Sequence, residues 1–266
     1  MFSVIIPLYN KEVEIKNTLN SVLSQTYKYF EVIIVNDGST DTSLKVANSF
    51  NDDRIKIIDQ KNGGVSLARN KGIKEANYKW IAFLDADDLW EPNHLEVLSK
   101  AINKYNEYSV FCTSYIRTGQ DLPSLNNQSV TIISDYYKKV LEEGHFFWTS
   151  VVCINKDVFD KIGYFRVDLS RGEDLELWSR IADVFKIVKL NLVTAEYVLY
   201  SQNKLTKTSV NKFNNSILNN IEFDSLEGNK KKYFKYLILK KIKETILNKN
   251  WSQFFKIIYK YHVNII

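Results

Sequence analysis

The sequence is poor in cysteine and proline, and it lacks a long apolar run. None of its apolar runs approaches the ~18 residues that a membrane-spanning helix needs. Cys112 and Cys153 stand among apolar or small neighbours, which excludes a disulfide framework and a cysteine metal site and predicts buried, reduced thiols. The first strand pattern begins at Phe2, so we expect no signal peptide and a protein kept in the cytoplasm.

Positive charge is concentrated at one end of the chain. The net charge is +5, but residues 204–266 contain 13 Lys and four acidic residues, which leaves residues 1–203 with a net charge of −4. This tail shows helical spacing through Tyr233-Phe234 and from Trp251 to Tyr261. A basic amphipathic helix of this kind can lie on an anionic membrane surface, here through residues 211–266. A helical hairpin packed on the preceding domain explains the pattern equally well.

Strand and helix patterns alternate in the first half of the chain. Strand patterns fall at residues 2–7, 30–35, 54–58 and 79–84, and helical patterns fall at 11–24 and 65–76. Such alternation predicts right-handed crossovers and a mostly parallel central sheet flanked by helices. The first half is therefore expected to have a Rossmann-like, nucleotide-binding architecture.

The second half is less regular. Helical patterns fall at 92–104, 134–142, 156–162 and from Arg171 onward, strand patterns fall at 110–115 and 147–154, and 117–130 is expected to be a surface loop. A chain of 266 residues exceeds the usual size of one domain. We predict an α/β domain at 1–203, with halves 1–110 and 111–203, followed by a basic amphipathic helical tail at 204–266.

Three carboxylates end the strand pattern that begins at Trp80. Asp85, Asp87 and Asp88 fall within four positions, at the end of a strand where open α/β sheets bind ligands. They would raise one another's pKa unless a cation or hydrogen-bond donors offset their charge. Oxygen ligands favour Mg²⁺ or Mn²⁺ shared with a substrate phosphate. The alternative is a helix N-cap, which we assign to Asp88 before a helix opened by Trp90-Glu91-Pro92.

Further polar clusters follow strands or precede helices elsewhere in the chain. They are Pro7-Leu-Tyr9-Asn10, Asn36-Asp37-Gly38-Ser39, Asn62-Gly63-Gly64 with Arg69-Asn70, and Glu173-Asp174. Taken together and in this order, the clusters resemble those of the family 2 glycosyltransferases, which have the GT-A fold. The resemblance extends from Phe2 to about Tyr200. It implies a bacterial surface-glycan type of enzyme that uses a nucleotide sugar, usually a UDP-sugar, and inverts the anomeric carbon.

The resemblance also implies roles for individual residues. At the donor end, Pro7, Tyr9 and Ala86 would line the nucleotide-sugar pocket, and Asp37 would bind the uracil. Asn62 and Arg69 would flank base and phosphates. Asp85 would hold the ribose, and Asp87 would bind Mn²⁺ or Mg²⁺. At the acceptor end, Asp174 would be the general base, and Glu173 would orient the loop or touch the acceptor. The alternative for the Glu173-Asp174 pair is helix capping and pairing with the helix dipole.

Four residues depart from the family pattern or carry a weaker assignment. Asn36 stands where many relatives have a second Asp, from which we expect little consequence. Trp148 is expected either in the acceptor cleft or in a core strand. Many relatives have Arg or His after the strand that ends near Tyr200, and Lys204 or Lys207 is the expected substitute here.

Rival functions lack their own motifs. A dinucleotide oxidoreductase needs Gly-x-Gly-x-x-Gly after the first strand, and a haloacid dehalogenase-like phosphatase needs its Asp-x-Asp on that strand. A polyprenyl-phosphate sugar synthase and a non-catalytic, membrane-associated scaffold remain the alternatives. We predict transfer of a hexose or N-acetylhexosamine to a saccharide or lipid-linked saccharide, in surface-polysaccharide or glycolipid synthesis. The protein is expected to bind peripherally to the inner face of the cell membrane and to have no nucleic-acid partner.

Overall fold

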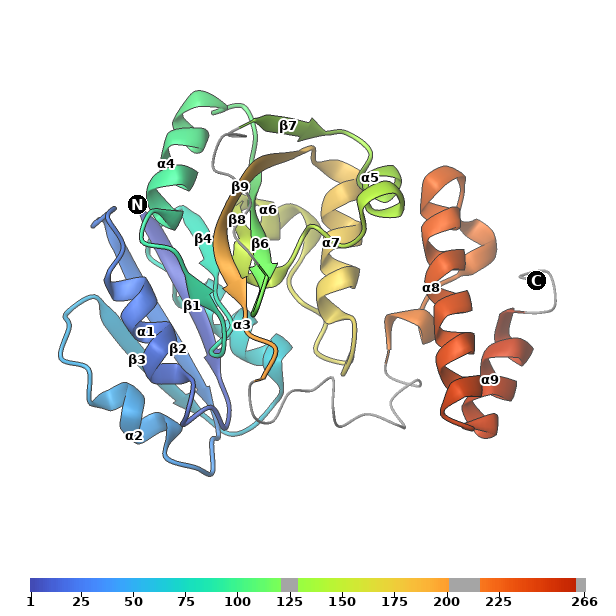
Figure 1. The fold of residues 1–266 in the computed structure, drawn as a ribbon, viewed down its shortest axis with the longest axis horizontal. Coiled ribbons are helices and arrows are strands. Elements are labelled where there is room, and N and C mark those ends of the chain that lie inside the picture. Colours follow the sequence, from blue (N-terminus) through green and yellow to red (C-terminus); the bar gives the residue numbers. More distant parts are fainter. Residues whose placement is uncertain (121–128, 201–215, 262–266) are drawn as a thin grey trace.

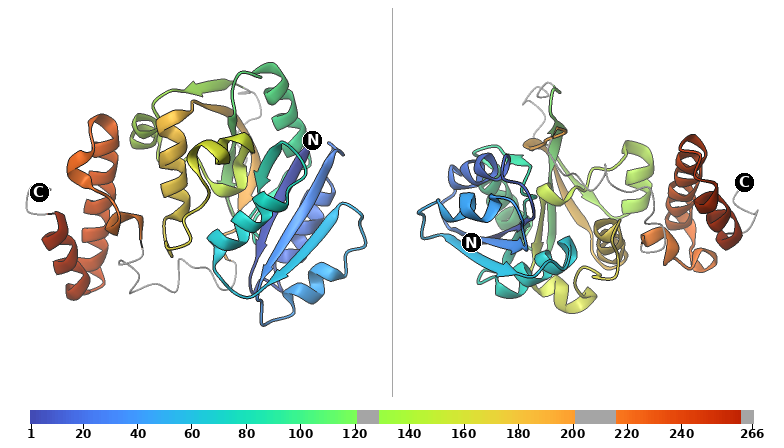
Figure 2. Two further views of the ribbon diagram at one scale, coloured as in Figure 1. Left: turned by 180° about the vertical axis from the view of Figure 1, so that it is seen from behind. Right: turned by 90° about the horizontal axis from the view of Figure 1, so that it is seen from below.

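The computed structural model describes residues 1–120, 129–200 and 216–261. Over these ranges the chain forms a nine-stranded sheet in the order β3-β2-β1-β4-β8-β6-β9-β5, and β7 pairs with β9 beside this path. Helices cover both faces of the sheet, and two further helices lie side by side at the C-terminal end of the molecule (Figures 1 and 2). This arrangement confirms the predicted α/β class with a C-terminal helical appendage.

The first half of the sheet is parallel throughout, as predicted. Its strands are β1 (Phe2–Leu8), β2 (Phe30–Asp37), β3 (Ile55–Gln60) and β4 (Trp80–Phe83). Helices α1 (Ile15–Leu23) and α2 (Ser43–Asn48) lie on one face, and α3 (Val65–Glu75) lies on the other. The strand order reverses between β1 and β4, and such a reversal is where open α/β sheets bind their ligands.

The second half of the sheet is mixed. β8 (Val152–Asn155) runs antiparallel to both β4 and β6 (Val110–Arg117), whereas β6 and β9 (Ile187–Tyr197) are parallel. The short strands β5 (Leu89–Trp90) and β7 (Val130–Ile133) pair antiparallel with β9. The helices of this half are α4 (His94–Lys104), α5 (Tyr136–Glu143), α6 (Asp157–Ile162) and α7 (Glu173–Val184).

Two details of this half differ from the sequence expectations. The strand predicted at 147–154 begins with a 3₁₀ turn (Thr149–Val151), so only its end pairs in the sheet. Helix α4 starts at His94 rather than at 92. Most of the loop predicted at 117–130 lies in 121–128, outside the described residues.

The core is densest where α3 packs on β1. The side chain of Ile5 is inaccessible to solvent, and a Cβ added at Gly72 of α3 would lie 2.5 Å from its Cγ2 atom. Only glycine therefore lets the helix approach the strand this closely. Cys112 and Cys153 are free and buried in the second half of the sheet, which confirms the predicted buried thiols. Burial raises the pKa of the Cys112 thiol to about 12.

The C-terminal region forms a helical hairpin of α8 (Gly228–Leu247) and α9 (Trp251–Tyr261), preceded by 3₁₀ turns at Ile217–Asn219 and Phe223–Ser225. Its inward face packs on α5, where Tyr233 meets the ring of Tyr137 at a centroid distance of 5.8 Å. Ile238 and Ile257 fill a second, smaller core within the hairpin. The helical spacing predicted for the tail is confirmed. No helix among the described residues has the length and apolar character to cross a membrane.

Candidate active site

Polar side chains gather where β1 and β4 end, opposite the first turn of α7. Asp85, Asp87 and Asp88 follow β4 directly, as the sequence predicted. The structure answers the question of how three adjacent carboxylates coexist, because each of them meets a different group. The three pairings are made by residues distant in sequence, which the topology of the sheet brings to this edge.

Asp85 and Asp87 are each paired with a basic side chain. Arg69 Nη2 donates to Asp85 Oδ1 at 2.7 Å, and Lys11 Nζ donates to Asp87 Oδ2 at 2.9 Å. Both pairs are largely shielded from solvent, since the side chains of Lys11 and Asp87 are 12% and 13% exposed and those of Arg69 and Asp85 are 5% and 22% exposed. The two carboxylates expected at the ribose and the metal are therefore held in defined positions.

Asp88 was predicted to cap the following helix, and this is wrong. The helix that follows is α4, and its N-cap is Asn93. Asp88 instead turns inward, where its carboxylate accepts from Ser150 Oγ at 2.6 Å and from Trp148 Nε1 at 3.3 Å. Burial, followed by repulsion from Asp85 and Asp87, raises the pKa of Asp88 to about 8. The error arose because strand β5 intervenes between the acidic cluster and the helix.

Arg69 connects the acidic cluster to Glu173, the neighbour of the predicted base. Its guanidinium is buried, and besides Asp85 it donates from Nη1 to Glu173 Oε1 at 3.2 Å. Burial disfavours the guanidinium charge, but the neighbouring carboxylates Asp85 and Glu173 outweigh it and raise the pKa of Arg69. Among the described residues its buried Nε finds no hydrogen-bond acceptor. Arg69 thus spans the two ends of the site.

Glu173 and Asp174 form the first turn of α7, following Gly172 in a left-handed conformation at φ +74°. Asp174 is half-buried, and its Oδ1 accepts from the N–H of Leu175 at 2.8 Å. Burial raises the pKa of Asp174 above its ordinary value, although the charge of Arg69 opposes the rise. A carboxylate with a raised pKa is better matched to proton abstraction near neutral pH.

The C-terminal segment holds the loop before α7. The N–H of Ile217 donates to the carbonyl of Arg171 at 3.2 Å, and this contact forms a parallel bridge between Arg171 and Ser216. A Cβ added at Gly172 would lie 2.7 Å from Ile217 Cγ2. Gly172 is therefore required both for its positive φ and for the close approach of the C-terminal segment to the loop that carries the predicted base.

At the nucleotide end, Asp37 organises the loop after β3. Its carboxylate accepts from the N–H groups of Gly63 and Gly64 at 2.8 Å each, and its carbonyl accepts from Asn62 Nδ2 at 2.9 Å. Asp37 is buried, whereas the ring of Tyr9, at the end of β1, is 46% exposed. The structure thus brings the predicted residues of the loops after β1, β2 and β3 to one edge of the sheet.

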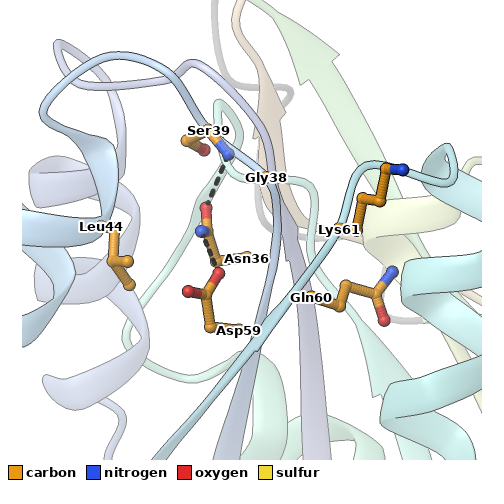
Figure 3. Close-up of a pocket in the computed structure, with 7 residues that line it drawn as sticks. All are labelled: Asn36, Gly38, Ser39, Leu44, Asp59, Gln60 and Lys61. Atoms are coloured by element: carbon orange, nitrogen blue, oxygen red, sulfur yellow. Dashed lines mark hydrogen bonds between the residues drawn. The ribbon is translucent and has the colours of Figure 1, made fainter.

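A hollow of about 390 Å³ lies beside this edge (Figure 3). It is lined by Asn36, Gly38, Ser39, Leu44, Asp59, Gln60 and Lys61. Asn36 Nδ2 donates to Asp59 Oδ1 at 2.7 Å, and its Oδ1 accepts from the N–H of Ser39 at 3.3 Å. An unprotonated Asp at position 36 would lack the amide donor to Asp59, so Asn suits this position in this chain.

The remaining predicted residues are placed as follows. Pro7 is in β1, and the carbonyl of the buried Ala86 accepts from Thr18 Oγ1 at 3.0 Å. Trp148 touches the acidic cluster through Asp88, and its ring packs against Tyr197 at a centroid distance of 4.7 Å. Lys204 and Lys207 lie outside the described residues.

Sequence reasoning missed Lys11 and the hydrogen bond that Ser150 makes to Asp88. Lys11 directly follows the Pro7-to-Asn10 motif, but a single lysine there has no pattern that distinguishes it from a surface residue. Ser150 carried a weak signal, as the neighbour of Trp148 in a segment already associated with the cleft. Its link to Asp88, 62 residues earlier in the chain, depends on how β4 and β8 pair.

The residues present fit a divalent cation shared with a ligand. The described residues contain no group of three His, Cys, Asp or Glu side chains placed to hold a metal ion by themselves. Asp87, with Asp85 nearby, offers oxygen ligands suited to Mg²⁺ or Mn²⁺. Such ions are commonly held by one or two carboxylates together with substrate phosphates, so the donor set matches that chemistry.

Comparison with known proteins establishes the family. Residues 3–163 match the model of glycosyl transferase family 2, and the chain belongs to this family. An uncharacterized glycosyltransferase of Rickettsia bellii is 37% identical over 184 residues, which are 68% of this chain and 26% of that protein. Glycosyltransferase GlyA of Streptococcus pneumoniae is 42% identical over 105 residues, 39% of this chain and 15% of that protein. The chain thus spans about a quarter or less of the length of these two relatives.

Solved structures confirm the predicted GT-A fold. Staphylococcus aureus TarS 1–349 in complex with UDP-GlcNAc matches with a TM-score of 0.66 and 22% identity, over 78% of this chain and 61% of that chain. The same protein in complex with UDP matches with a TM-score of 0.63 and 23% identity, over 74% of this chain and 60% of that chain.

Proposed function

We propose that the chain transfers a hexose or N-acetylhexosamine, with inversion, from a UDP-sugar to a saccharide or lipid-linked saccharide in surface-polysaccharide or glycolipid synthesis. The observation that carries this proposal is the bridge made by Arg69 between Asp85 and Glu173. It joins a candidate donor and metal end to a candidate base end within one site. Family membership supports the reaction class, and the UDP-GlcNAc complex of TarS supports the donor class.

The donor would lie along the edge formed by the loops after β1, β2 and β3. The exposed Tyr9 is available to line the nucleotide pocket, for which Pro7 and Ala86 remain our further candidates, and Asp37 with Asn62 shapes the loop for the uracil. Asp85, fixed by Arg69, would meet the ribose. The hollow beside Asn36 adjoins this proposed position (Figure 3).

Asp87 would hold Mn²⁺ or Mg²⁺, which offsets the charge that develops on the leaving diphosphate. Cleavage of the glycosyl–phosphate bond passes through an oxocarbenium-like state, as in glycoside hydrolysis. Arg69, fixed between Asp85 and Glu173, would flank the base and phosphates of the donor together with Asn62. Lys204 and Lys207 remain our candidates for a further charge on the diphosphate.

Asp174 would act as the base. As the acceptor oxygen bonds to the anomeric carbon from the face opposite the diphosphate, the bond to the diphosphate oxygen breaks and Asp174 takes the proton of the acceptor hydroxyl. Glu173, held by Arg69, would fix the first turn of α7 in place. Trp148 and Tyr197 present neighbouring rings beside the acidic cluster and are our candidates for the acceptor cleft.

We also propose that the hairpin rests on an anionic membrane at the inner face of the cell. Its outward face exposes seven large apolar side chains, Tyr236, Leu239, Ile246, Leu247, Trp251, Phe255 and Tyr259. Lys232, Lys240, Lys243, Lys249 and Lys256 are exposed alongside them, and the one acidic residue of 228–261, Glu244, is paired with Lys241 at 3.1 Å. Each lysine near an anionic surface contributes about 1 kcal/mol of attraction.

The direct test of the transfer reaction is the variant Asp174→Asn. A panel of sugar nucleotides, assayed with and without Mn²⁺, first identifies the donor. Asp174→Asn should then lower turnover by about 10²- to 10⁴-fold, because a positioned base contributes that much. Full turnover by this variant, or a product that retains the donor's anomeric configuration, would contradict the proposed mechanism.

A further inference from the structure

A lysine of the chain forms an ion pair with the carboxylate proposed to bind the metal. Lys11 Nζ lies 2.9 Å from Asp87 Oδ2, and the two residues are 76 positions apart in sequence. Ion pairs between exposed side chains contribute little and form in many geometries. This pair differs, because both side chains are largely shielded from solvent and lie at the edge of the sheet where ligands are expected.

The backbone around Lys11 is built to hold it there. Its N–H donates to Ser43 Oγ at 2.7 Å, and the preceding Asn10 adopts a left-handed conformation at φ 50°. The N–H of Asn10 donates to Ser39 Oγ at 3.1 Å, while its side-chain oxygen accepts from the N–H of Thr40 at 2.8 Å. The loop after β1 is thus braced on the loop before α2, and that bracing offsets the cost of a left-handed Asn.

Lys11 supplies Asp87 with a cation of the chain, as Arg69 supplies one to Asp85. Asp85 is met by Arg69, and Asp88 is buried among hydrogen-bond donors. Asp87, the carboxylate proposed to bind the divalent cation, is paired with the ammonium of Lys11. A divalent cation bound at Asp87 would repel this ammonium, so the two cations compete for the same carboxylate.

We propose that Lys11 holds Asp87 in the donor-free protein and makes divalent metal binding depend on the donor. The donor's diphosphate supplies the ammonium with a new anionic partner, so the ion and the donor bind tightly only together. By thermodynamic reciprocity, the factor by which UDP tightens metal binding equals the factor by which metal tightens UDP binding. This inference rests on the metal site proposed at Asp87.

The test measures metal affinity rather than turnover. Mn²⁺ is titrated into the full chain, with and without UDP, and free Mn²⁺ is followed by electron paramagnetic resonance. We expect UDP to tighten Mn²⁺ binding to the unaltered protein by about 5- to 150-fold, the usual range of coupling between sites. In Lys11→Met, Mn²⁺ alone should bind more tightly and the added effect of UDP should shrink. Lys11→Arg, which keeps a cation at this position, should preserve the coupling.

Lys16→Met is the matched control, because Lys16 is an exposed lysine of α1 five positions further along. It removes the same charge without touching Asp87 and should leave Mn²⁺ affinity unchanged. Thermal unfolding confirms that each variant is folded.

An unchanged or weaker affinity of Lys11→Met for Mn²⁺ alone overturns the role of Lys11. The proposed metal site survives that result if Asp87→Ala still abolishes the UDP-dependent binding of Mn²⁺. If the unaltered protein binds no Mn²⁺ even with UDP, both the metal site and the role of Lys11 are overturned.

Discussion

Two charged regions of this molecule are built in opposite ways. At the sheet edge, Asp85, Asp87 and Glu173 each face a basic side chain of the same chain, at distances of 2.7 to 3.2 Å. On the outward face of the hairpin, lysines are exposed among apolar side chains, and the one acid of residues 228–261, Glu244, faces only Lys241. Charges that are paired within the chain fix the positions of the side chains in the site, whereas charges that face the solvent are available to a binding partner. We therefore expect variants of the first region to change chemistry and variants of the second to change location.

The largest effect on turnover is expected from Arg69→Met, which removes the cation that bridges Asp85 and Glu173. Arg69 lowers the pKa of Asp174, so its loss should raise that pKa further and leave less of the base deprotonated at a given pH. Turnover should fall, and the acid limb of its pH profile should move to higher pH. Arg69→Lys, which keeps the charge, should hold the limb near its original position.

Loss of a buried partner also destabilises, by about 3–5 kcal/mol where a charge is left unpaired. Thermal unfolding therefore accompanies the pH profiles of both Arg69 variants. An acid limb that stays in place in a folded Arg69→Met protein would contradict the role of Arg69 in tuning Asp174.

A smaller effect is expected from Ile217→Ala, which loosens the contact between the C-terminal segment and Gly172. Truncating a buried Ile costs about 2–5 kcal/mol of stability wherever it stands. Ile238→Ala is the matched control, because Ile238 is also buried but lies in the separate core of the hairpin. Turnover should fall more in Ile217→Ala than in Ile238→Ala, with UDP affinity retained in both. Equal losses would mean that the segment only stabilises the fold.

The smallest effect on chemistry is expected from the hairpin face. Trp251, Phe255 and Tyr259 form one stripe at successive four-residue intervals of α9 and are 53%, 64% and 84% exposed. Replacing all three by Ser should weaken sedimentation with phosphatidylglycerol vesicles, while turnover on a soluble acceptor stays unchanged.

The matched control replaces Tyr29, Val167 and Val184, which are exposed to a similar degree elsewhere on the chain. Binding of the unaltered protein should also weaken with added salt, since screening shortens the reach of the lysine charges. Vesicle binding that ignores both the triple replacement and the salt would rule out this face as a membrane contact.

Much of this structure could be predicted from local patterns. Alternating apolar segments located β1 to β4 and the helices between them, because each pattern reports the burial of its own element. The acids after β4 and before α7 were recognisable for the same reason, since they stand at the ends of elements. The tail was read correctly as helical. Of the two interpretations of the tail, packing on the preceding domain concerns its inward face, which contacts α5. Binding to a membrane concerns its outward face and stays a prediction.

What local patterns could not supply is which distant residues meet. Lys11 reaches Asp87 and Ser150 reaches Asp88 only through the order and pairing of the strands. Asp88 was assigned to a helix because its neighbours in sequence suggested one, while its partners come from the 3₁₀ turn before β8 and from the segment after β9. Gly172 and Ile217 likewise gain their relation from the path of the C-terminal segment.

The central claim is that the site has two separable carboxylate ends, with Asp87 on the side of the metal and donor and Asp174 on the side of the acceptor. Calorimetric titration of UDP, with and without Mn²⁺, into Asp87→Ala and Asp174→Asn tests it most directly. We predict that Asp87→Ala loses the Mn²⁺-dependent part of UDP binding, while Asp174→Asn binds UDP and Mn²⁺ as the unaltered protein does. Retained Mn²⁺-dependent binding in Asp87→Ala, or its loss in Asp174→Asn, would contradict this division.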